Sequence, residues 1–226
     1  MNLVETLKVE AIASISEGIK MCDAAEGLSA FNSKGAELVI WRRTLPARFQ
    51  TWLEGVEPSN LPEQRVLIRP RDVPSAVIGI FNECAMPVGD MRNLLAGDIH
   101  DLVSRFANIT QSEFVDVRLE RINHNSCWKF HRDNVEARLL TTYCGPATEW
   151  VRPLDAENAL LQQKNFNGPI EFLQGNDVAI FKGSVAGSGS GIVHRSPPIE
   201  GTGCTRLLLC LNQRSEISPS PWPAGR

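Results

Sequence analysis

From Glu113 onward, the sequence consists of short apolar runs separated by turn residues. The runs favour strands, whereas the Gly, Pro and Asn residues between them are typical of tight turns. Strands are predicted at 114–122, 128–133, 137–143, 148–152, 170–173, 178–182, 192–194 and 205–212. Many short strands at this spacing predict a β-sandwich or a barrel. The exception is 153–165, where the sequence indicates a helical or loop insertion.

The N-terminal half has a different pattern, because several of its apolar residues recur at helical spacing. Helices are predicted at 3–21, 47–53 and 89–108, and two further strands at 37–41 and 66–68. No internal repeat or linker is visible. We therefore expect one domain over 1–226, in which a helical and mixed part, 1–110, packs on a β core at 111–215. The predicted fold class is mainly β with N-terminal helices (α+β).

Composition excludes several classes of protein. The net charge is −3 and the Lys and Arg residues are scattered, so no basic face for nucleic acid is expected. No apolar run approaches the roughly 20 residues of a membrane span, and the N-terminus has no uninterrupted apolar core typical of a signal peptide. The six Cys residues contain no C-x-x-C pair, which favours reduced thiols and a cytoplasmic location.

A pair of metal-ligand residues, His131 and Asp133, lies two positions apart in the predicted strand 128–133. Residues two apart on a strand point to the same side of the sheet. With His194 at the end of a later strand, the pair would complete a 2-His-1-carboxylate set, which leaves metal positions open. Two alternatives remain: a hydrogen-bonded pair with no metal, or a tetrahedral zinc site that includes Cys127.

A lone cation, Arg206, lies in the apolar run CTRLLLCLN. Alternation places it on a face with Leu and Cys residues, where an unpaired charge is costly. A dicarboxylic cosubstrate would pair with it in bidentate geometry, and Glu149 is the alternative partner. Tyr143, which is the only Tyr in the chain, shares a strand face with Thr141, and we expect its hydroxyl to hold the same carboxylate.

The chain resembles the Fe(II)/2-oxoglutarate-dependent oxygenase superfamily, and most nearly its prolyl-4-hydroxylase-like branch, in the order of its motifs. These are H-x-D, Tyr143, G-x-x-T-E-W, G-N-D-V-A-I-F, a distal His and an Arg, over about 113–213. The spellings C-x-x-F-H-x-D, G-P-A-T-E-W and V-H-R-S-P-P also resemble a bacterial family of uncharacterised function. A departure is the single Gly145, where the branch usually has two glycines.

This resemblance implies a double-stranded β-helix (jelly-roll, cupin-like) core with an iron centre. It implies that His131, Asp133 and His194 bind Fe(II), and that Arg206 binds the distal carboxylate of 2-oxoglutarate with help from Tyr143 and Thr141. The expected activity is hydroxylation of a small molecule or a protein side chain by oxidative decarboxylation of 2-oxoglutarate. Two other readings are a cupin-like protein that binds zinc or iron without turnover, and a cupin-fold enzyme that uses no oxo acid. Neither has a need for Arg206. Substrate and oligomeric state are not indicated.

Overall fold

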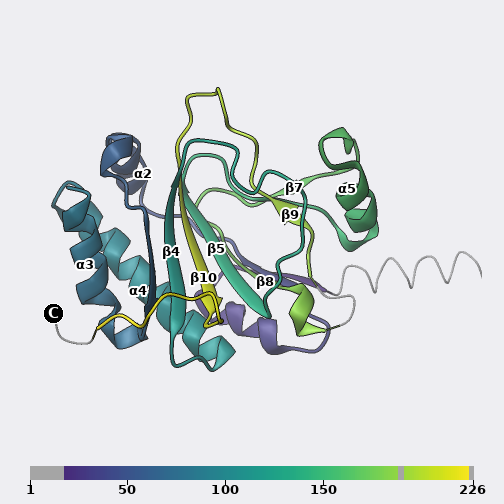
Figure 1. Cartoon of the computed structure of the whole chain (residues 1–226), viewed down its shortest axis with the longest axis horizontal. Coiled ribbons are helices and arrows are strands. Elements are labelled where there is room, and N and C mark those ends of the chain that lie inside the picture. The colour runs from purple at the N-terminus through teal and green to yellow at the C-terminus, as the bar shows by residue number, and fades with distance from the viewer. Residues whose placement is uncertain (1–17, 188–190, 224–226) are drawn as a thin grey trace, which may run out of the picture.

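The computed structural model describes residues 18–187 and 191–223, which form two sheets with helices outside the larger one (Figure 1). The large sheet has the strand order β1-β2-β8-β5-β10-β4-β3, and the small sheet the order β7-β6-β9. The strands are β1 (Ile19–Cys22), β2 (Leu38–Trp41), β3 (Gln64–Ile68), β4 (Val115–Ile122), β5 (Ala137–Cys144), β6 (Glu149–Trp150), β7 (Glu171–Phe172), β8 (Val178–Lys182), β9 (His194–Arg195) and β10 (Arg206–Gln213). Neighbouring strands are antiparallel except β1 and β2, which pair in parallel.

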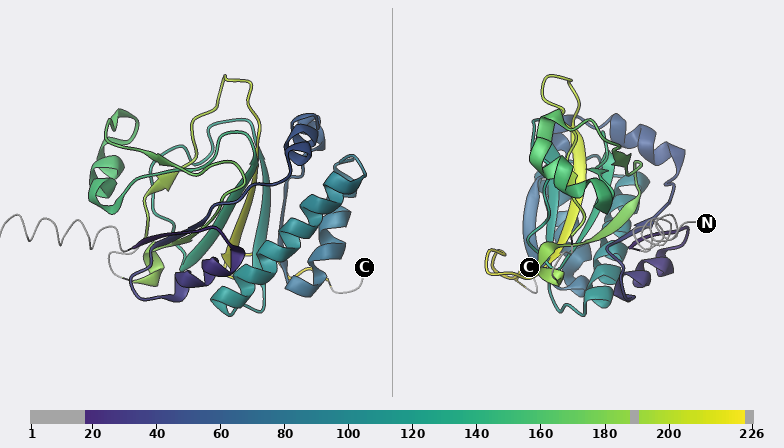
Figure 2. Two further views of the ribbon diagram at one scale, coloured as in Figure 1. Left: turned by 180° about the vertical axis from the view of Figure 1, so that it is seen from behind. Right: turned by 90° about the vertical axis from the view of Figure 1, so that its right-hand side faces the viewer.

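The longer helices are α2 (Ala47–Glu54), α3 (Val73–Glu83), α4 (Asp90–Thr110) and α5 (Ala156–Gln162). Short 3-10 helices lie at Ala25–Asn32, Pro58–Asn60, Pro70–Asp72, Pro153–Asp155, Gln163–Asn165 and Ser184–Ala186. Figure 2 shows from behind that the long teal helix α4 crosses the outer face of the large sheet, whereas α5 lies at the far end, beside the small sheet. None of the helices in the described part of the chain has the length and apolar character needed to cross a membrane.

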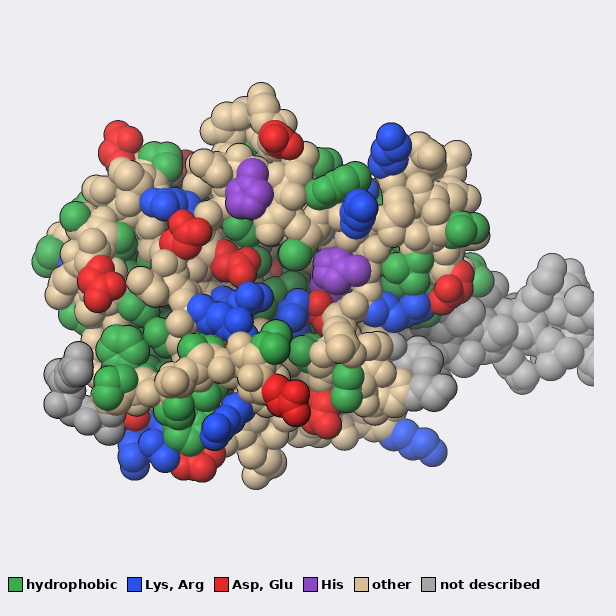
Figure 3. Space-filling view, in the orientation of Figure 1, with side chains coloured by type: hydrophobic (Ala, Val, Ile, Leu, Met, Phe, Trp, Pro, Cys, Tyr) green, Lys and Arg blue, Asp and Glu red, His purple; other side chains and the backbone are tan. Residues whose placement is uncertain are grey.

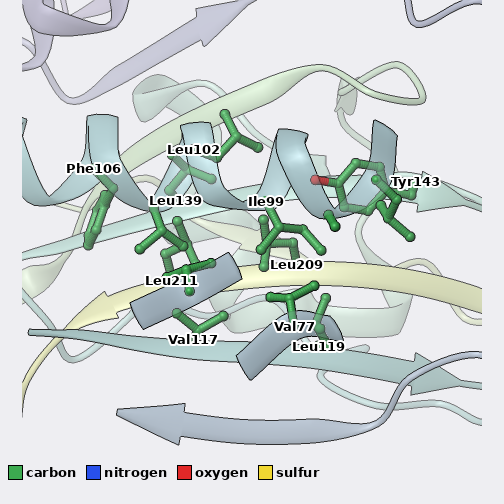
Figure 4. Close-up of a cluster of buried hydrophobic side chains, with 14 of the residues drawn as sticks. Val77, Ile99, Leu102, Phe106, Val117, Leu119, Leu139, Tyr143, Leu209 and Leu211 are labelled. Carbon is green, nitrogen blue, oxygen red and sulfur yellow. The ribbon is translucent and has the colours of Figure 1, made fainter. Parts of the chain in front are cut away.

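Alternation along the central strands builds the main core between the large sheet and the helices (Figure 4). One face of β4, β5 and β10 meets apolar residues that recur every three or four positions along α4. The facing residues are Val117, Leu119, Leu139, Leu209 and Leu211 from the strands and Ile99, Leu102 and Phe106 from α4. Burial of each such side chain contributes about 1.5–3 kcal/mol, so this layer fixes the sheet against α4.

The opposite face of the same strands turns toward the small sheet and encloses a second interior. Its apolar part joins Leu38, Phe181 and Leu208 of the large sheet with Trp150 of the small sheet. The predicted mainly β fold with helices from the N-terminal half is therefore confirmed: two sheets face each other across an interior, as in a double-stranded β-helix.

The N-terminal half departs from the prediction in its contribution to the large sheet. Strands β1, β2 and β3 extend this sheet at both ends, so the half does more than pack on a later core. The helix predicted at 3–21 is wrong at its end, because Ile19–Cys22 pairs with Leu38–Trp41 as a strand. Its earlier part, 3–17, lies outside the described residues.

Several other predicted elements are confirmed. The helices at 47–53 and 89–108 are present as α2 and α4, although α4 continues to Thr110 before Gln111 adopts a left-handed conformation (φ 52°). The insertion at 153–165 is helical and contains α5.

Candidate metal centre

His131 and Asp133 lie in the loop that leads from β4 to β5, so the predicted strand at 128–133 is wrong. The segment pairs with a strand at a single position, where the backbones of His131 and His194 exchange two hydrogen bonds of 3.0 Å. Cys127 has a φ of 50°, in the left-handed region, which turns the chain away from an extended ladder. The two ligand residues are therefore brought together by loop contacts and not by strand alternation.

The backbone of Asp133 is fixed by the segment that follows β8. Its carbonyl accepts hydrogen bonds from the Ser184 backbone N–H (2.8 Å) and the Ser184 hydroxyl (3.1 Å). A Cβ on Gly183 would lie 2.0 Å from the Val135 carbonyl oxygen and 2.7 Å from that of Asp133. Only glycine allows this close approach, so Gly183 is part of what positions the carboxylate.

The ligand atoms of His131, Asp133 and His194 all lie within 4.8 Å of one another. The Nε2 atom of His131 is 3.6 Å from Asp133 Oδ1, and Nε2 of His194 is 3.3 Å from Asp133 Oδ2. Nitrogen and oxygen ligands bound to one ion at about 2.1 Å are roughly 3–4 Å apart. The spacing therefore suits three ligands of one divalent ion, the set predicted from the sequence.

Both imidazole rings are oriented by backbone carbonyls two residues earlier. Nδ1 of His131 donates to the Lys129 carbonyl (2.8 Å), and Nδ1 of His194 donates to the Ile192 carbonyl (3.0 Å). A carbonyl oxygen can only accept, so each neutral ring carries its proton on Nδ1 and offers the Nε2 lone pair. The His194 ring also packs against Phe181 and His131, with centroids 4.8 and 4.7 Å apart.

Asp133 is a buried carboxylate with one free oxygen. Arg138 donates to Oδ1 and is itself held by Asn212 Oδ1 at 2.8 Å, whereas Oδ2 is buried without a hydrogen-bond partner among the described residues. Burial alone would raise the pKa of Asp133, but its contacts with His131 and His194 and the charge of Arg138 lower this pKa well below the ordinary value. A negative carboxylate whose unsatisfied Oδ2 faces the Nε2 atom of His194 fits a metal ligand.

Arg206 is a fully buried cation, and it has no carboxylate partner within the described part of the chain. Its Nη1 donates to the Ser196 hydroxyl (2.7 Å) and its Nη2 to the Thr142 hydroxyl (3.5 Å), while Nε has no partner among the described residues. Burial lowers the pKa of the Arg206 guanidinium to about 10. Glu149, the alternative partner, accepts from Arg195 Nε at 2.6 Å instead. The guanidinium thus retains donors for an anion.

Gly145 lies in the turn after β5, where the backbone packs closely against Arg206. Its φ is 78°, and an added Cβ would lie 2.6 Å from the Thr205 carbonyl oxygen and 3.0 Å from Arg206 Cγ. The turn after β5 therefore packs directly on the start of β10, and one glycine is enough for this approach.

A cavity of about 190 Å³ lies between the two sheets and links the metal-ligand group to the surroundings of Arg206. It is lined by Arg118, Glu120, Ser126, Cys127, His131, Arg138, Leu140, Thr148, His194, Ser196, Leu208 and Cys210. Figure 3 shows basic side chains, an acidic side chain and a histidine around a hollow near the middle of this face. The lining joins the ligands His131 and His194 with Ser196, which contacts the guanidinium.

Tyr143 and Thr141 do not line this cavity, so its geometry gives no support to the expectation that they bind the cosubstrate. The Tyr143 hydroxyl donates to Asp98 Oδ2 of α4 at 2.6 Å, and Tyr143 belongs to the helix-side core (Figure 4). Thr141 is fully buried at an alternate position of the same strand. The shared face of the two residues was predicted correctly, but it is the outer face of β5.

Residues of the inner face of β5 were missed as members of the site. Arg138 and Thr142 flank Leu140 at alternate positions and contact Asp133 and Arg206 respectively. The two-residue period of a strand, which places Thr141 and Tyr143 on one face, also places Arg138 and Thr142 on the other. The signal that could have selected this second face as the site is the buried cation Arg206.

Cys127 lines the cavity but is not part of the group of ligand atoms. The described residues therefore give no geometric support to a tetrahedral zinc site with Cys127 as a fourth ligand. A larger open depression of about 530 Å³, lined by residues that include Phe31, Lys182 and Gln213, contains no such ligand group among the described residues.

The fold and the site define a double-stranded β-helix protein with a candidate 2-His-1-carboxylate metal centre. The chain belongs to the family described as "Protein of unknown function (DUF1826)", whose model matches residues 22–212. A search of curated proteins gives no match.

Similar solved structures include dioxygenases for auxin oxidation and a prolyl-4-hydroxylase. The dioxygenase for auxin oxidation from rice is 11% identical, with a TM-score of 0.44 over 81% of this chain and 77% of its own. The corresponding enzyme of Arabidopsis thaliana, in a binary complex with 2-oxoglutarate, is 14% identical, with a TM-score of 0.39 over 96% and 82%. A Pseudomonas putida prolyl-4-hydroxylase is 12% identical, with a TM-score of 0.39 over 84% and 94%.

Proposed function

We propose that this protein is an Fe(II)- and 2-oxoglutarate-dependent oxygenase that hydroxylates its substrate. The observation that carries the proposal is the fully buried Arg206, which has no carboxylate partner in the described chain. Its guanidinium contacts Ser196, which lines the same cavity as the ligand residues His131 and His194. In the overall reaction, a substrate C–H, O₂ and 2-oxoglutarate give the C–OH product, succinate and CO₂. A protein that only stores or senses a metal does not need a buried cation.

The residues of the site have separable roles in this reaction. When bound, iron supplies the activation of O₂ that is coupled to decarboxylation of the oxo acid. His131, Asp133 and His194 would hold the ion on one side and leave its other positions open. Arg138 keeps the Asp133 carboxylate ionised and aimed through its contact with Oδ1.

The cosubstrate would extend from the ion toward Arg206. Ser196 and Thr142 orient the guanidinium, which pairs with the distal carboxylate of the diacid. Leu208, on the same face of β10, lines the cavity and helps to exclude water. We place this activity in the cytoplasm, which agrees with six free cysteines.

An anaerobic spectrum tests the proposal. Fe(II) and 2-oxoglutarate added to the protein should give the weak visible charge-transfer band of a chelated iron–oxo-acid pair. We expect this band in the wild type and in Arg152→Ala, a control that changes a half-exposed arginine paired with Glu171. It should be absent in His131→Ala and Arg206→Ala. Iron binding without a band in the wild type would favour a cupin-like metal protein without turnover.

A further inference from the structure

We propose that the substrate is a small zwitterion of the free α-amino-acid type, with its carboxylate bound by Arg118 and its ammonium group by Glu120. This inference rests on the proposed function, because it assigns the part of the cavity that the metal ligands and Arg206 leave free. It starts from two opposite charges on one strand.

Arg118 and Glu120 lie two residues apart on β4 and both line the cavity. Their side chains are 34% and 32% exposed, and Arg118 Nη1 is 3.6 Å from Glu120 Oε1. That distance is too long for a hydrogen bond. Neither side chain makes a hydrogen bond to any other of the described residues. A cation and an anion therefore face the same space with free donors and acceptors.

The other charges around the cavity are already engaged. Arg138 is bound to Asp133 and Asn212, and Asp133 faces the two imidazoles. Arg206 lies fully buried behind Ser196, where a cosubstrate that enters first would be enclosed. Half-exposed charges at the wall suit a ligand that enters afterwards from solvent.

The register of the sheet places this charged pair two strands away from Arg138, which contacts the ligand residue Asp133. Arg118 is opposite Cys210 of β10, and Cys210 is opposite Leu140 of β5. Arg138 lies two residues before Leu140 on the same face of β5. Adjacent strands are about 4.8 Å apart, so β4 and β5 are separated by roughly 10 Å. A free amino acid held at β4 could extend its side chain across this gap and present a C–H bond near the ion.

Arginine and glutamate together select for both charges of the ligand. The guanidinium offers paired donors to a carboxylate, and the glutamate accepts from an ammonium group. A residue inside a peptide lacks both charges, and an N-acylated amino acid lacks the ammonium group. The peptide residue would leave both charges of the pair without a partner and the N-acylated amino acid would leave Glu120 without one, which disfavours binding of either.

The test uses four sets of probes: free L-amino acids, their N-acetyl derivatives, their amides and their N-acetyl amides. Binding is measured by calorimetry on Mn(II)-loaded protein with 2-oxoglutarate, and stimulated succinate release is measured on the Fe(II) enzyme. We expect at least one free amino acid to bind and to stimulate turnover, and each blocked derivative to bind about 10- to 100-fold more weakly. Arg118→Gln and Glu120→Gln should weaken binding of the free amino acid by a similar factor.

Two controls separate this inference from the proposed function. Arg121→Gln changes an arginine on the opposite face of β4, paired with Glu63, and should bind the amino acid as the wild type does. Arg118→Gln and Glu120→Gln should keep the charge-transfer band, because they leave the ligand residues and Arg206 intact. Amino-acid binding in a protein without that band would overturn the proposed function and support the charged pair.

Three results would overturn the zwitterion proposal. One is failure of all free amino acids to bind while the band is present. Another is equal binding of free and N-acetylated forms. The third is unchanged binding in both Arg118→Gln and Glu120→Gln, which would leave these residues as an ordinary solvated ion pair.

Discussion

Arg206→Met is expected to leave the metal-free protein at least as stable as the wild type, although Arg206 is one of the largest fully buried side chains. Burial lowers the pKa of its guanidinium to about 10, and this fall corresponds to a destabilisation of about 3 kcal/mol for the charged form. The penalty is complete at neutral pH. It declines as the pH rises through 10, because the folded state then loses its proton before the unfolded state does.

The substitution removes this penalty but also removes two hydrogen bonds, from Nη1 to Ser196 and from Nη2 to Thr142. Loss of these two bonds costs about 1–2 kcal/mol, which offsets part of the ~3 kcal/mol regained from the burial penalty. The free energy of unfolding should therefore rise by about 1 kcal/mol, which raises the Tm by about 2–4 °C for a chain of this size. Replacing a buried charge by an apolar side chain of similar volume is often neutral or stabilising.

The assay is denaturation of each protein with Mn(II), with and without 2-oxoglutarate. The wild type should gain about 2.7 kcal/mol at a concentration of 100 times Kd, whereas Arg206→Met should gain nothing. Arg195→Met is the matched control, because it breaks the pair with Glu149 and should destabilise the protein by about 2 kcal/mol or more. A loss of 3 kcal/mol or more in Arg206→Met, together with normal stabilisation by 2-oxoglutarate, would refute this reasoning.

Three further substitutions test the framework of the site. Arg138→Met should lower metal affinity by about 10- to 100-fold, because it leaves the Asp133 carboxylate unoriented; calorimetry with wild-type affinity would contradict this. Tyr143→Phe should lower the free energy of unfolding by about 2 kcal/mol through loss of the bond to Asp98, yet keep the charge-transfer band, whose disappearance would return Tyr143 to the cosubstrate site. Gly183→Ala should reduce both Tm and metal binding, because its Cβ would meet a backbone carbonyl at 2.0 Å; a wild-type Tm would show that this backbone yields easily.

The fold was predictable where a local pattern decides the structure. The helix α4 and the strands β4, β5, β8 and β10 follow directly from periods of 3.6 and 2, and their predicted boundaries differ by a few residues at most. The strand Ile19–Cys22 was not predictable in this way. Its conformation depends on parallel pairing with Leu38–Trp41, a contact that no local pattern contains.

The site was predictable in its residue types but only partly in its geometry. His131, Asp133 and His194 come together as expected, yet they do so through a loop held at Gly183 and a single backbone bridge. Strand alternation correctly placed Tyr143 and Thr141 on one face of β5, but it does not determine which face of β5 lines the cavity. That choice depends on where α4 packs, which is a tertiary contact.

The structure of the protein with Mn(II) and 2-oxoglutarate tests the central claim most directly. We predict one ion on the Nε2 atoms of His131 and His194 and on a carboxylate oxygen of Asp133, with the far carboxylate of the diacid on Arg206. An ion bound elsewhere, or a diacid that leaves the Arg206 guanidinium without an anionic partner, would contradict the proposed oxygenase.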